Sequence, residues 1–168
     1  MTLIIRNSTG GPSPGERGFS LMELMVSLTL MTVMFAVGVP AMSRYLRTNH
    51  VLGSANNLAG ELRLARQRAV SEQNWVIFSW SLADDHYRWH DDDDSDGVAD
   101  TGEYISDWRE LPNGVDLVNG ASAFGTASVT FRANGSASQA GQLKVANAEN
   151  LSRTIQLVAA SGLVKVLS

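Results

Sequence analysis

A run of carboxylates in the middle of the chain has the spacing of a calcium-binding loop. Over residues 92–103, acidic residues stand at places 1, 3, 5, 9 and 12, and a glycine stands at place 6. This order fits the EF-hand calcium loop, in which carboxylates and one backbone carbonyl surround the ion at ~2.4 Å. The predicted ligands are Asp92, Asp94, Asp96, the Val98 carbonyl, Asp100 and Glu103.

Two other interpretations of this acidic segment stay open. The flanking stretches 86–90 and 103–108 are typical of strands rather than of the EF-hand helices. The segment could therefore be a hairpin turn without metal, or an acidic binding surface exposed to solvent. Carboxylates this close repel one another when no cation is present. Ca²⁺ is the candidate ligand of this loop. We expect that the protein requires no cofactor.

Glu23 is a second candidate functional residue, outside the acidic segment. It is the one ionisable side chain between Phe19 and Met42, a stretch rich in Leu, Met and Val. As a helix, these 24 residues cover the ~30 Å of a bilayer's hydrocarbon core. An unpaired carboxylate inside such a helix costs at least ~2.5 kcal/mol, so Glu23 is predicted to be functional and to need a cationic or donor partner.

A secretory signal peptide is the alternative interpretation of the apolar stretch. It would need a shorter apolar run followed by a small-residue cleavage site. Here the run is followed by Ser43, Arg44 and Tyr45. A membrane-spanning helix is therefore the prediction.

The residues around Glu23 also carry a resemblance. The stretch Gly18-Phe19-Ser20-Leu21-Met22-Glu23-Leu24, after Glu16-Arg17 and before an apolar helix, closely resembles the amino-terminal signature of type IV pilins and type II secretion pseudopilins. In that family, a membrane prepilin peptidase cuts after the glycine and methylates the new amino terminus. The resemblance implies cleavage between Gly18 and Phe19, and N-methylation of Phe19. The Glu23 carboxylate could then pair with the Phe19 amine of a neighbouring subunit, which relieves both buried charges.

The helix is expected to continue past Pro40. This proline lacks an N–H and clashes with the carbonyl four residues earlier, so a kink or local melting is predicted there. Beyond it, apolar residues recur at helical spacing to about residue 71: Leu58, Leu62, Ala65 and Ala69. Three arginines on this helix are expected to point into solvent: Arg63, Arg66 and Arg68.

The remaining chain is predicted to form short strands separated by turns rich in Gly, Asn and Pro. The predicted fold class is α+β, with one long amino-terminal helix packed on a carboxy-terminal antiparallel β-sheet domain of pilin-like type. The predicted strands are 75–80, 86–89, 104–106, 115–118, 128–132, 143–146, 154–159 and 163–167.

This organisation divides the chain into four parts. With the resemblance, residues 1–18 are expected to form a cleaved leader and residues 19–42 a transmembrane and filament-core helix. Residues 43–72 are expected to form an amphipathic helix, and residues 73–168 a β-rich periplasmic or extracellular domain. The second helical segment resembles that of the GspH/FimT subgroup of minor pilins and pseudopilins.

Composition and charge exclude several classes of protein. There are no cysteines, which removes disulfide frameworks and thiolate chemistry. Residues 1–72 carry seven basic and four acidic residues, and residues 73–168 carry six and thirteen, giving +3 and −7. No G-x-S-x-G motif, H-E-x-x-H motif or phosphate-binding glycine loop is present, so we expect no enzyme activity. His86 and His90 are expected to be exposed at strand edges rather than to bind metal.

The resemblance implies a structural minor subunit of a pilus-like filament, either a type IV pilus or a type II secretion pseudopilus. Its implied partners are prepilin peptidase, other minor and major pilins or pseudopilins, an inner-membrane assembly platform with an ATPase, and membrane lipid before assembly. The implied location is the bacterial inner membrane, crossed once, with the amino terminus cytoplasmic, and later the filament.

DNA binding is the alternative function. Some FimT-like minor pilins bind DNA during natural transformation, through a Gly-Arg-x-Arg element near the carboxy terminus. The matching stretch here keeps Gly162, replaces both arginines and retains one lysine, Lys165. Together with the acidic distal half, this departure disfavours nucleic acid as a partner.

Overall fold

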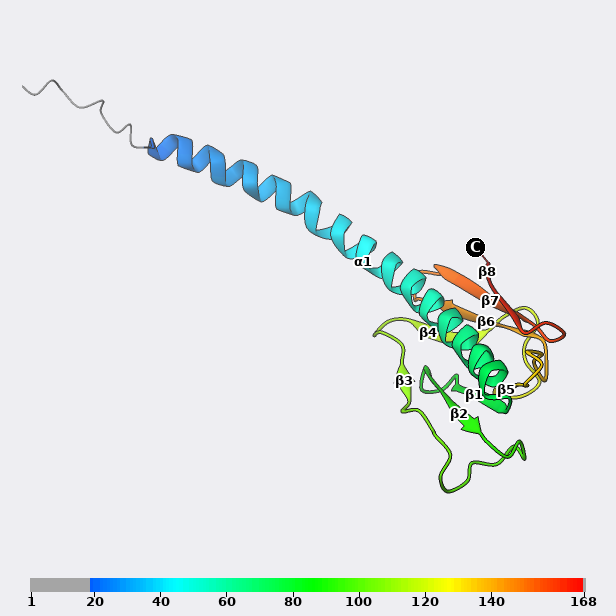
Figure 1. Ribbon diagram of the computed structural model, residues 1–168. Helices are drawn as coiled ribbons and strands as arrows, with labels where there is room; N and C mark the ends of the chain where they lie inside the picture. Colours follow the sequence, from blue (N-terminus) through cyan, green and yellow to red (C-terminus); the bar gives the residue numbers. More distant parts are fainter. Residues whose placement is uncertain (1–18, 168) are drawn as a thin grey trace, which may run out of the picture. The chain divides into compact units, whose positions relative to one another are not determined.

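The computed structural model describes residues 19–167, which fall into two compact units that meet between Ala41 and Met42. The helix α1, Leu21–Glu72, contributes to both units (Figure 1). From residue 73 to residue 167, the chain forms β-strands, turns and loops, and this part belongs to the second unit. Each unit is described by itself below.

In the second unit, α1 buries one face against the strands. The predicted apolar positions are confirmed, since each is at most 1% exposed: Leu58, Leu62, Ala65 and Ala69. The buried face extends back to Val51 and includes Ala55 and Ala59. Small side chains on this face allow strands to approach the helix closely. The helix ends at Glu72, and the next residue, Gln73, has a φ of 59°, the left-handed conformation common just after helix ends.

The strands form two four-stranded antiparallel sheets. The first has the order β3-β2-β1-β5 and the second β4-β6-β7-β8. Figure 1 shows the second half of α1 beside both sheets. The strands of the first sheet are β1 Trp75–Ser81, β2 His86–Asp92, β3 Arg109–Glu110 and β5 Ser128–Phe131. Those of the second are β4 Asp116–Asn119, β6 Gly141–Ala146, β7 Ser152–Val158 and β8 Leu163–Leu167. The α+β class, with one long helix on antiparallel sheets, is confirmed.

One predicted strand is wrong. Residues 104–106 make only an isolated bridge, between Ile105 and His90, and the edge strand β3 comes later, at Arg109–Glu110. The backbone at 104–106 does bond to β2: the Asp91 N–H donates to the Tyr104 carbonyl and the Ser106 N–H to the Trp89 carbonyl. These are too few paired residues for a strand.

The core of the second unit is one cluster drawn from α1 and both sheets. Every second residue of the strands points into it, as in Val76, Phe78 and Trp80 of β1. Phe78 is fully buried, and its ring stacks on that of Tyr87 with 5.6 Å between centroids. All of its buried residues lie between 51 and 164, within the second unit.

Replacing Phe78 tests this core. We expect Phe78→Ala to lower the free energy of unfolding of residues 42–168 by ~3–5 kcal/mol, because it leaves a cavity among aromatic rings. Val118→Ala, at a β4 position that is 37% exposed, should change it by no more than ~0.5 kcal/mol. Urea unfolding followed by tryptophan fluorescence measures both. Equal effects of the two substitutions would contradict the assignment of Phe78 to the core.

Candidate functional site

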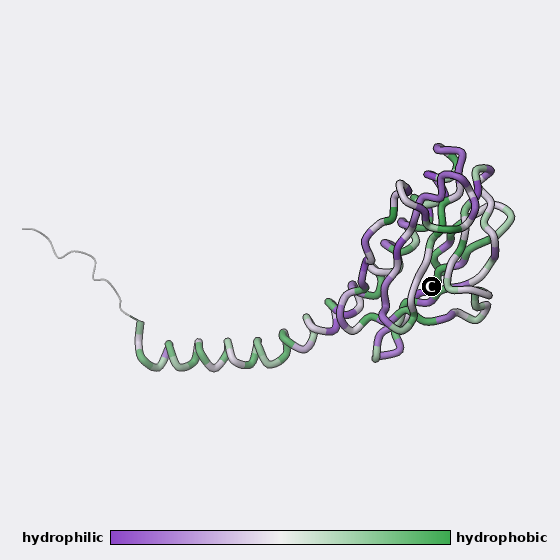
Figure 2. Tube along the Cα trace, turned by 90° about the horizontal axis from the view of Figure 1, so that it is seen from below, coloured by the Kyte–Doolittle hydropathy of each residue, from purple (hydrophilic) through white to green (hydrophobic). Residues whose placement is uncertain are grey.

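The apolar first half of α1 is the first candidate site. Every residue from Phe19 to Met42 is exposed. An 18-residue window in this helix has a mean hydropathy of 2.0 and none of it is buried, and its length and composition suffice to cross a membrane. Figure 2 shows the apolar colouring along this stretch. Such a surface is unfavourable in water, so lipid or other protein must cover it.

Most polar groups in this segment are satisfied inside the helix. The hydroxyl groups of Ser27, Thr29 and Thr32 each donate to the carbonyl four residues earlier, at 2.8 Å. A hydroxyl bonded in this way needs no outside partner in an apolar environment. These residues are therefore compatible with lipid or with packed helices.

Glu23 differs from these hydroxyls. It lies in the first turn of α1, and within residues 19–167 its carboxylate has no hydrogen-bond or ion-pair partner. The amino-terminal end of a helix favours a negative charge, but only by up to ~1 kcal/mol at an exposed position. Phe19 is described and 78% exposed, whereas Gly18, the predicted cleavage residue, lies outside the described residues. A partner for Glu23 must come from outside this part of the chain.

Pro40 lies inside α1 and does not end it. The helical conformation is continuous through this residue. Of the two effects predicted for this proline, local melting does not occur in the described helix, and a kink stays a prediction.

The acidic loop after β2 is the second candidate site. One carboxylate oxygen from each of Asp92, Asp94 and Asp96 lies within 4.8 Å of the other two. The Asp96 N–H donates to Asp92 Oδ1 at 3.1 Å and to Asp94 Oδ1 at 3.2 Å. The Gly97 N–H donates to Asp92 Oδ2 at 2.9 Å, and its φ of 85° is one that glycine adopts readily. The first three predicted ligands therefore converge around a glycine turn.

The other predicted ligands do not join this group. Glu103 closes the loop instead: its Oε1 accepts from the Asp93 N–H at 3.0 Å and its Oε2 from the Asp100 N–H at 2.8 Å. The Val98 N–H donates to Asp96 Oδ1 at 2.7 Å, and the Val98 side chain is exposed. Completing a calcium shell would require Glu103 to exchange these two bonds for the ion.

Burial makes the ionised form of Asp92 costly. This residue is 0% exposed, and burial raises the pKa of its carboxyl, while the N–H groups of Gly97 and Asp96 lower the pKa and the Glu103 carboxylate raises it. Oxygens within 4.8 Å of one another can share a cation bound at ~2.4 Å. A divalent cation among the three aspartates would favour their ionised forms. The first half of the loop therefore fits calcium.

Arg68 does not point into solvent as predicted. Its guanidinium lies 4.5 Å from the centroid of the Trp89 ring and 5.8 Å from that of Tyr104. Its Nε lies 3.1 Å from Glu72 Oε1, and its Nη2 lies 3.8 Å from Asp91 Oδ2. A planar cation can stack on rings and bind carboxylates together, which explains the difference.

The pKa of the Asp91 carboxyl, which lies beside Arg68, is raised. Burial, followed by the Glu72 carboxyl, raises its pKa from 3.8 to about 6, against the lowering effects of Asn74 and Arg68. The Asn74 amide donates to Asp91 Oδ1 at 2.9 Å. A raised acid pKa in the folded state means that this group favours folding at low pH. Its contribution is lost as the pH rises from 3.8 to about 6.

The two other helix arginines also bind the protein. Arg66 Nε donates to the carbonyls of Gly135 and Ser161, at 2.9 and 3.0 Å. Arg63 Nη2 donates to the Val164 carbonyl at 3.1 Å. Arg63 is exposed, as predicted, although its guanidinium also bonds to the backbone of β8. Arg66 is half-buried, so the prediction that it points into solvent is wrong, because backbone carbonyls at two turns accept from it.

The prediction for the two strand histidines is also wrong, since both are largely buried. The side chains of His86 and His90 are 19% and 13% exposed. The His86 ring lies 4.0 Å from that of Trp108, and His90 Nε2 lies 3.9 Å from Glu103 Oε2. The segment 104–110 runs antiparallel beside β2 and brings Trp108 against His86, a contact that the local sequence does not reveal.

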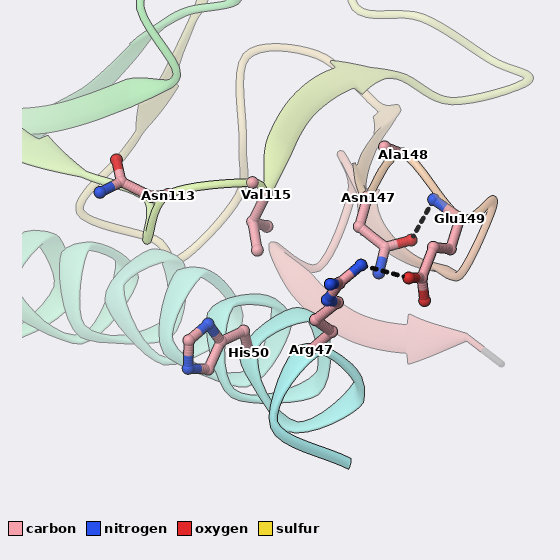
Figure 3. A pocket seen from close by; sticks show the side chains of 8 residues that line it. Arg47, His50, Asn113, Val115, Asn147, Ala148 and Glu149 are labelled. Carbon is pink, nitrogen blue, oxygen red and sulfur yellow. Dashed lines mark hydrogen bonds and ion pairs between the residues drawn. The ribbon is translucent and has the colours of Figure 1, made fainter. Parts of the chain in front are cut away.

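A small cavity of about 180 Å³ lies where α1 enters the second unit (Figure 3). Arg47 pairs with Glu149, and the Glu149 N–H donates to Asn147 Oδ1 at 3.1 Å. Both charged side chains are largely exposed, so their pair contributes at most ~1 kcal/mol. The Arg47–Glu149 pair joins the helix to the 147–150 turn.

Comparisons with known proteins agree with the amino-terminal segment and with the fold. The family described as type II transport protein GspH matches residues 54–162, and the prokaryotic N-terminal methylation motif matches residues 14–39. No curated protein matches the chain.

Solved structures show the same fold. The minor pseudopilin EpsH from the type 2 secretion system of Vibrio cholerae is 12% identical, with 71% of this chain and 97% of that chain covered and a TM-score of 0.56. The type IV minor pilin FimU of Pseudomonas aeruginosa is 14% identical, with 74% and 92% covered and a TM-score of 0.55.

Proposed function

The chain belongs to the family of the type II transport protein GspH, and we propose that it works as a minor structural subunit of a pilus-like filament. The exposed apolar surface of residues 19–42 carries this proposal. A second unit with its own core is attached to a helix that the described chain leaves uncovered. Lipid covers this helix before assembly, and the helices of neighbouring subunits cover it in the filament.

The amino-terminal segment of the chain is cleaved and methylated before assembly. Prepilin peptidase cuts between Gly18 and Phe19 and methylates the Phe19 amine. The match of residues 14–39 to the N-terminal methylation motif supports this step. Cleavage creates the positive charge that the Glu23 carboxylate lacks within the described residues. In a staggered array of helices, Glu23 of one subunit accepts from the amine of the next.

The mass of the mature chain tests this processing. We expect the first residue to be Phe19, with one added methyl group, in cells that contain prepilin peptidase. Without the peptidase the chain should keep its leader and stay in the membrane. An intact amino terminus at Met1 in peptidase-containing cells, or cleavage at another bond, would contradict the proposal. Intact-protein and peptide mass spectrometry distinguish these results.

The chain crosses the inner membrane once, with the leader in the cytoplasm and residues 73–168 on the periplasmic side. Its partners are other pilins or pseudopilins and the inner-membrane assembly platform with its ATPase. Its role is mechanical rather than enzymatic. Arg17 favours a cytoplasmic leader only weakly, because Arg44 and Arg47 flank the other end of the span.

The acidic loop is the chain's proposed ligand site. We propose that Asp92, Asp94 and Asp96 hold a calcium ion there, supported by the convergence of their oxygens. The Val98 carbonyl, Asp100 and Glu103 complete the shell after the loop rearranges. Bound calcium would neutralise the repulsion among the carboxylates and stiffen the link from β2 to β3.

A further inference from the structure

A groove of about 550 Å³ runs between α1 and the turns that follow β5 and β7, within the second unit. Arg63 and Arg66 lie on its helix side, and Asn134 and Ser71 add polar groups. Its apolar part includes Val70 and Leu163, which are 39% and 48% exposed. No aspartate or glutamate lines this groove. It is a basic and apolar surface on a domain that is otherwise acidic.

In the described part of the chain, Arg63 and Arg66 are held by hydrogen bonds to the backbone and not by ion pairs with carboxylates. Each is anchored by backbone carbonyls: Arg63 by Val164, and Arg66 by Gly135 and Ser161. Within residues 19–167, neither forms an ion pair with a carboxylate. Three other arginines do form such pairs, with Glu149, Glu72 and Glu61 respectively: Arg47, Arg68 and Arg109. Backbone anchoring leaves N–H groups of Arg63 and Arg66 available to a ligand.

The groove wall is shaped around Arg66. A Cβ on Gly162 would lie 2.2 Å from the Gly135 carbonyl oxygen and 2.8 Å from Arg66 Nε. Gly135 and Gly162 both have positive φ, 77° and 60°. Glycine at both turns therefore lets the two turns close on the arginine, which orders its guanidinium before any ligand arrives.

We propose that this groove binds a protein segment of a neighbouring filament subunit of another kind, which presents an aspartate or glutamate beside an apolar side chain. Guanidinium groups bind carboxylates through paired N–H···O bonds, and the apolar part of the groove takes the adjacent side chain. This inference rests on the proposed function, and names the chemistry by which the second unit contacts its neighbour.

Nucleic acid fits the groove less well. Two arginines neutralise about two phosphates, too few for strong binding to a polyanion. Residues 73–168 carry a net charge of −7, which repels a long anionic strand. A short acidic segment meets only the local charge of the groove.

Peptide binding to the full chain in detergent micelles tests the proposal. The probe is the fluorescently labelled hexapeptide Gly-Asp-Leu-Glu-Val-Gly with blocked ends, and its control is the amide analogue Gly-Asn-Leu-Gln-Val-Gly. We expect the acidic peptide to bind and the analogue to bind at least ~10-fold more weakly. Arg63→Gln should weaken binding of the acidic peptide by a similar factor. Arg153→Gln, a substitution outside the groove, should not.

Several outcomes would overturn the proposal. They are equal binding of the two peptides, no binding of the acidic peptide, no effect of Arg63→Gln, and tighter binding of a DNA duplex than of the acidic peptide. Self-association that Arg63→Gln abolishes would assign the groove to a second copy of the chain instead, and would also overturn it.

An experiment in cells distinguishes failure of this inference from failure of the proposed function. Gln67→Glu places a negative charge in the groove and leaves the anchors of both arginines intact. We expect the variant to be processed normally but to enter filaments several-fold less than the matched control Asn57→Glu, an exposed position on another face of α1. Equal incorporation of both variants would overturn the groove inference alone. Absence of the unmodified chain from filaments would overturn the proposed function.

Discussion

A Glu23→Ala chain should insert into the membrane and be cleaved as efficiently as the unmodified chain, yet be nearly absent from filaments. Removing the carboxylate makes the apolar segment more favourable in lipid. It also leaves the Phe19 amine of the neighbouring subunit without a partner in the filament core. A buried charge that loses its partner costs ~3–5 kcal/mol. This corresponds to at least a hundredfold loss of assembly.

Two further variants test whether the loss of the Glu23 charge causes the assembly defect. Glu23→Gln keeps the size and a hydrogen-bonding group but removes the charge, so it should also assemble poorly. Ser27→Ala removes a hydroxyl that bonds only within the helix, and it should assemble normally. Immunoblots of membranes and of filaments sheared from the same cells measure all three. Normal incorporation of the Glu23→Ala chain into filaments would contradict the charge-pairing mechanism.

Calcium should raise the melting temperature of residues 42–168 strongly. Calcium at ~100 times its dissociation constant adds ~2.7 kcal/mol to the stability of the folded state, if it binds only that state. For a unit of this size the rise is ~10 °C. Magnesium should have less effect, because it demands closer and more regular octahedral coordination. Differential scanning calorimetry after treatment with a chelator, with and without millimolar calcium, measures the shift.

Matched variants place the ion in the loop. Asp94→Asn removes a ligand at an exposed position and should abolish most of the calcium-dependent shift. Asp116→Asn removes an exposed carboxylate from β4 and should keep the full shift. If the unmodified chain shows no shift at millimolar calcium, the metal proposal is wrong and the loop is a hairpin turn.

The long helix was predictable because its determinants are local. Spacing alone identifies the buried face through Leu58, Leu62 and Ala65. The apolar span was equally clear, since only Glu23 interrupts it. Most strands followed from alternating burial and from turns such as that at Gly135. The pairing of strands into two sheets depends on contacts far apart in sequence, and no local pattern fixes that order.

The errors come from those distant contacts. Arg66 looks like a solvated helix charge until the turns at Gly135 and Ser161 close on it. His86 looks exposed until Trp108 lies against it. In each case a polar side chain is recruited by a segment at least 20 residues away, and the local sequence carries no trace of that contact.

The acidic loop was predicted in part. Its glycine turn and the convergence of Asp92, Asp94 and Asp96 follow from local spacing. The position of Glu103 does not, because its carboxylate caps the N–H groups of Asp93 and Asp100 in the structure. Acidic side chains at a turn can bind either backbone donors or a cation, and spacing alone does not choose between them.

If this chain is part of a filament, it should be present in filaments that are sheared from cells and purified away from membranes. Quantitative mass spectrometry should find the peptide that begins with methylated Phe19 at a small, constant ratio to the major subunit. The Glu23→Ala chain should be missing from the same preparation. Processed chain that is abundant in the membrane but absent from purified filaments would contradict a role as a filament subunit.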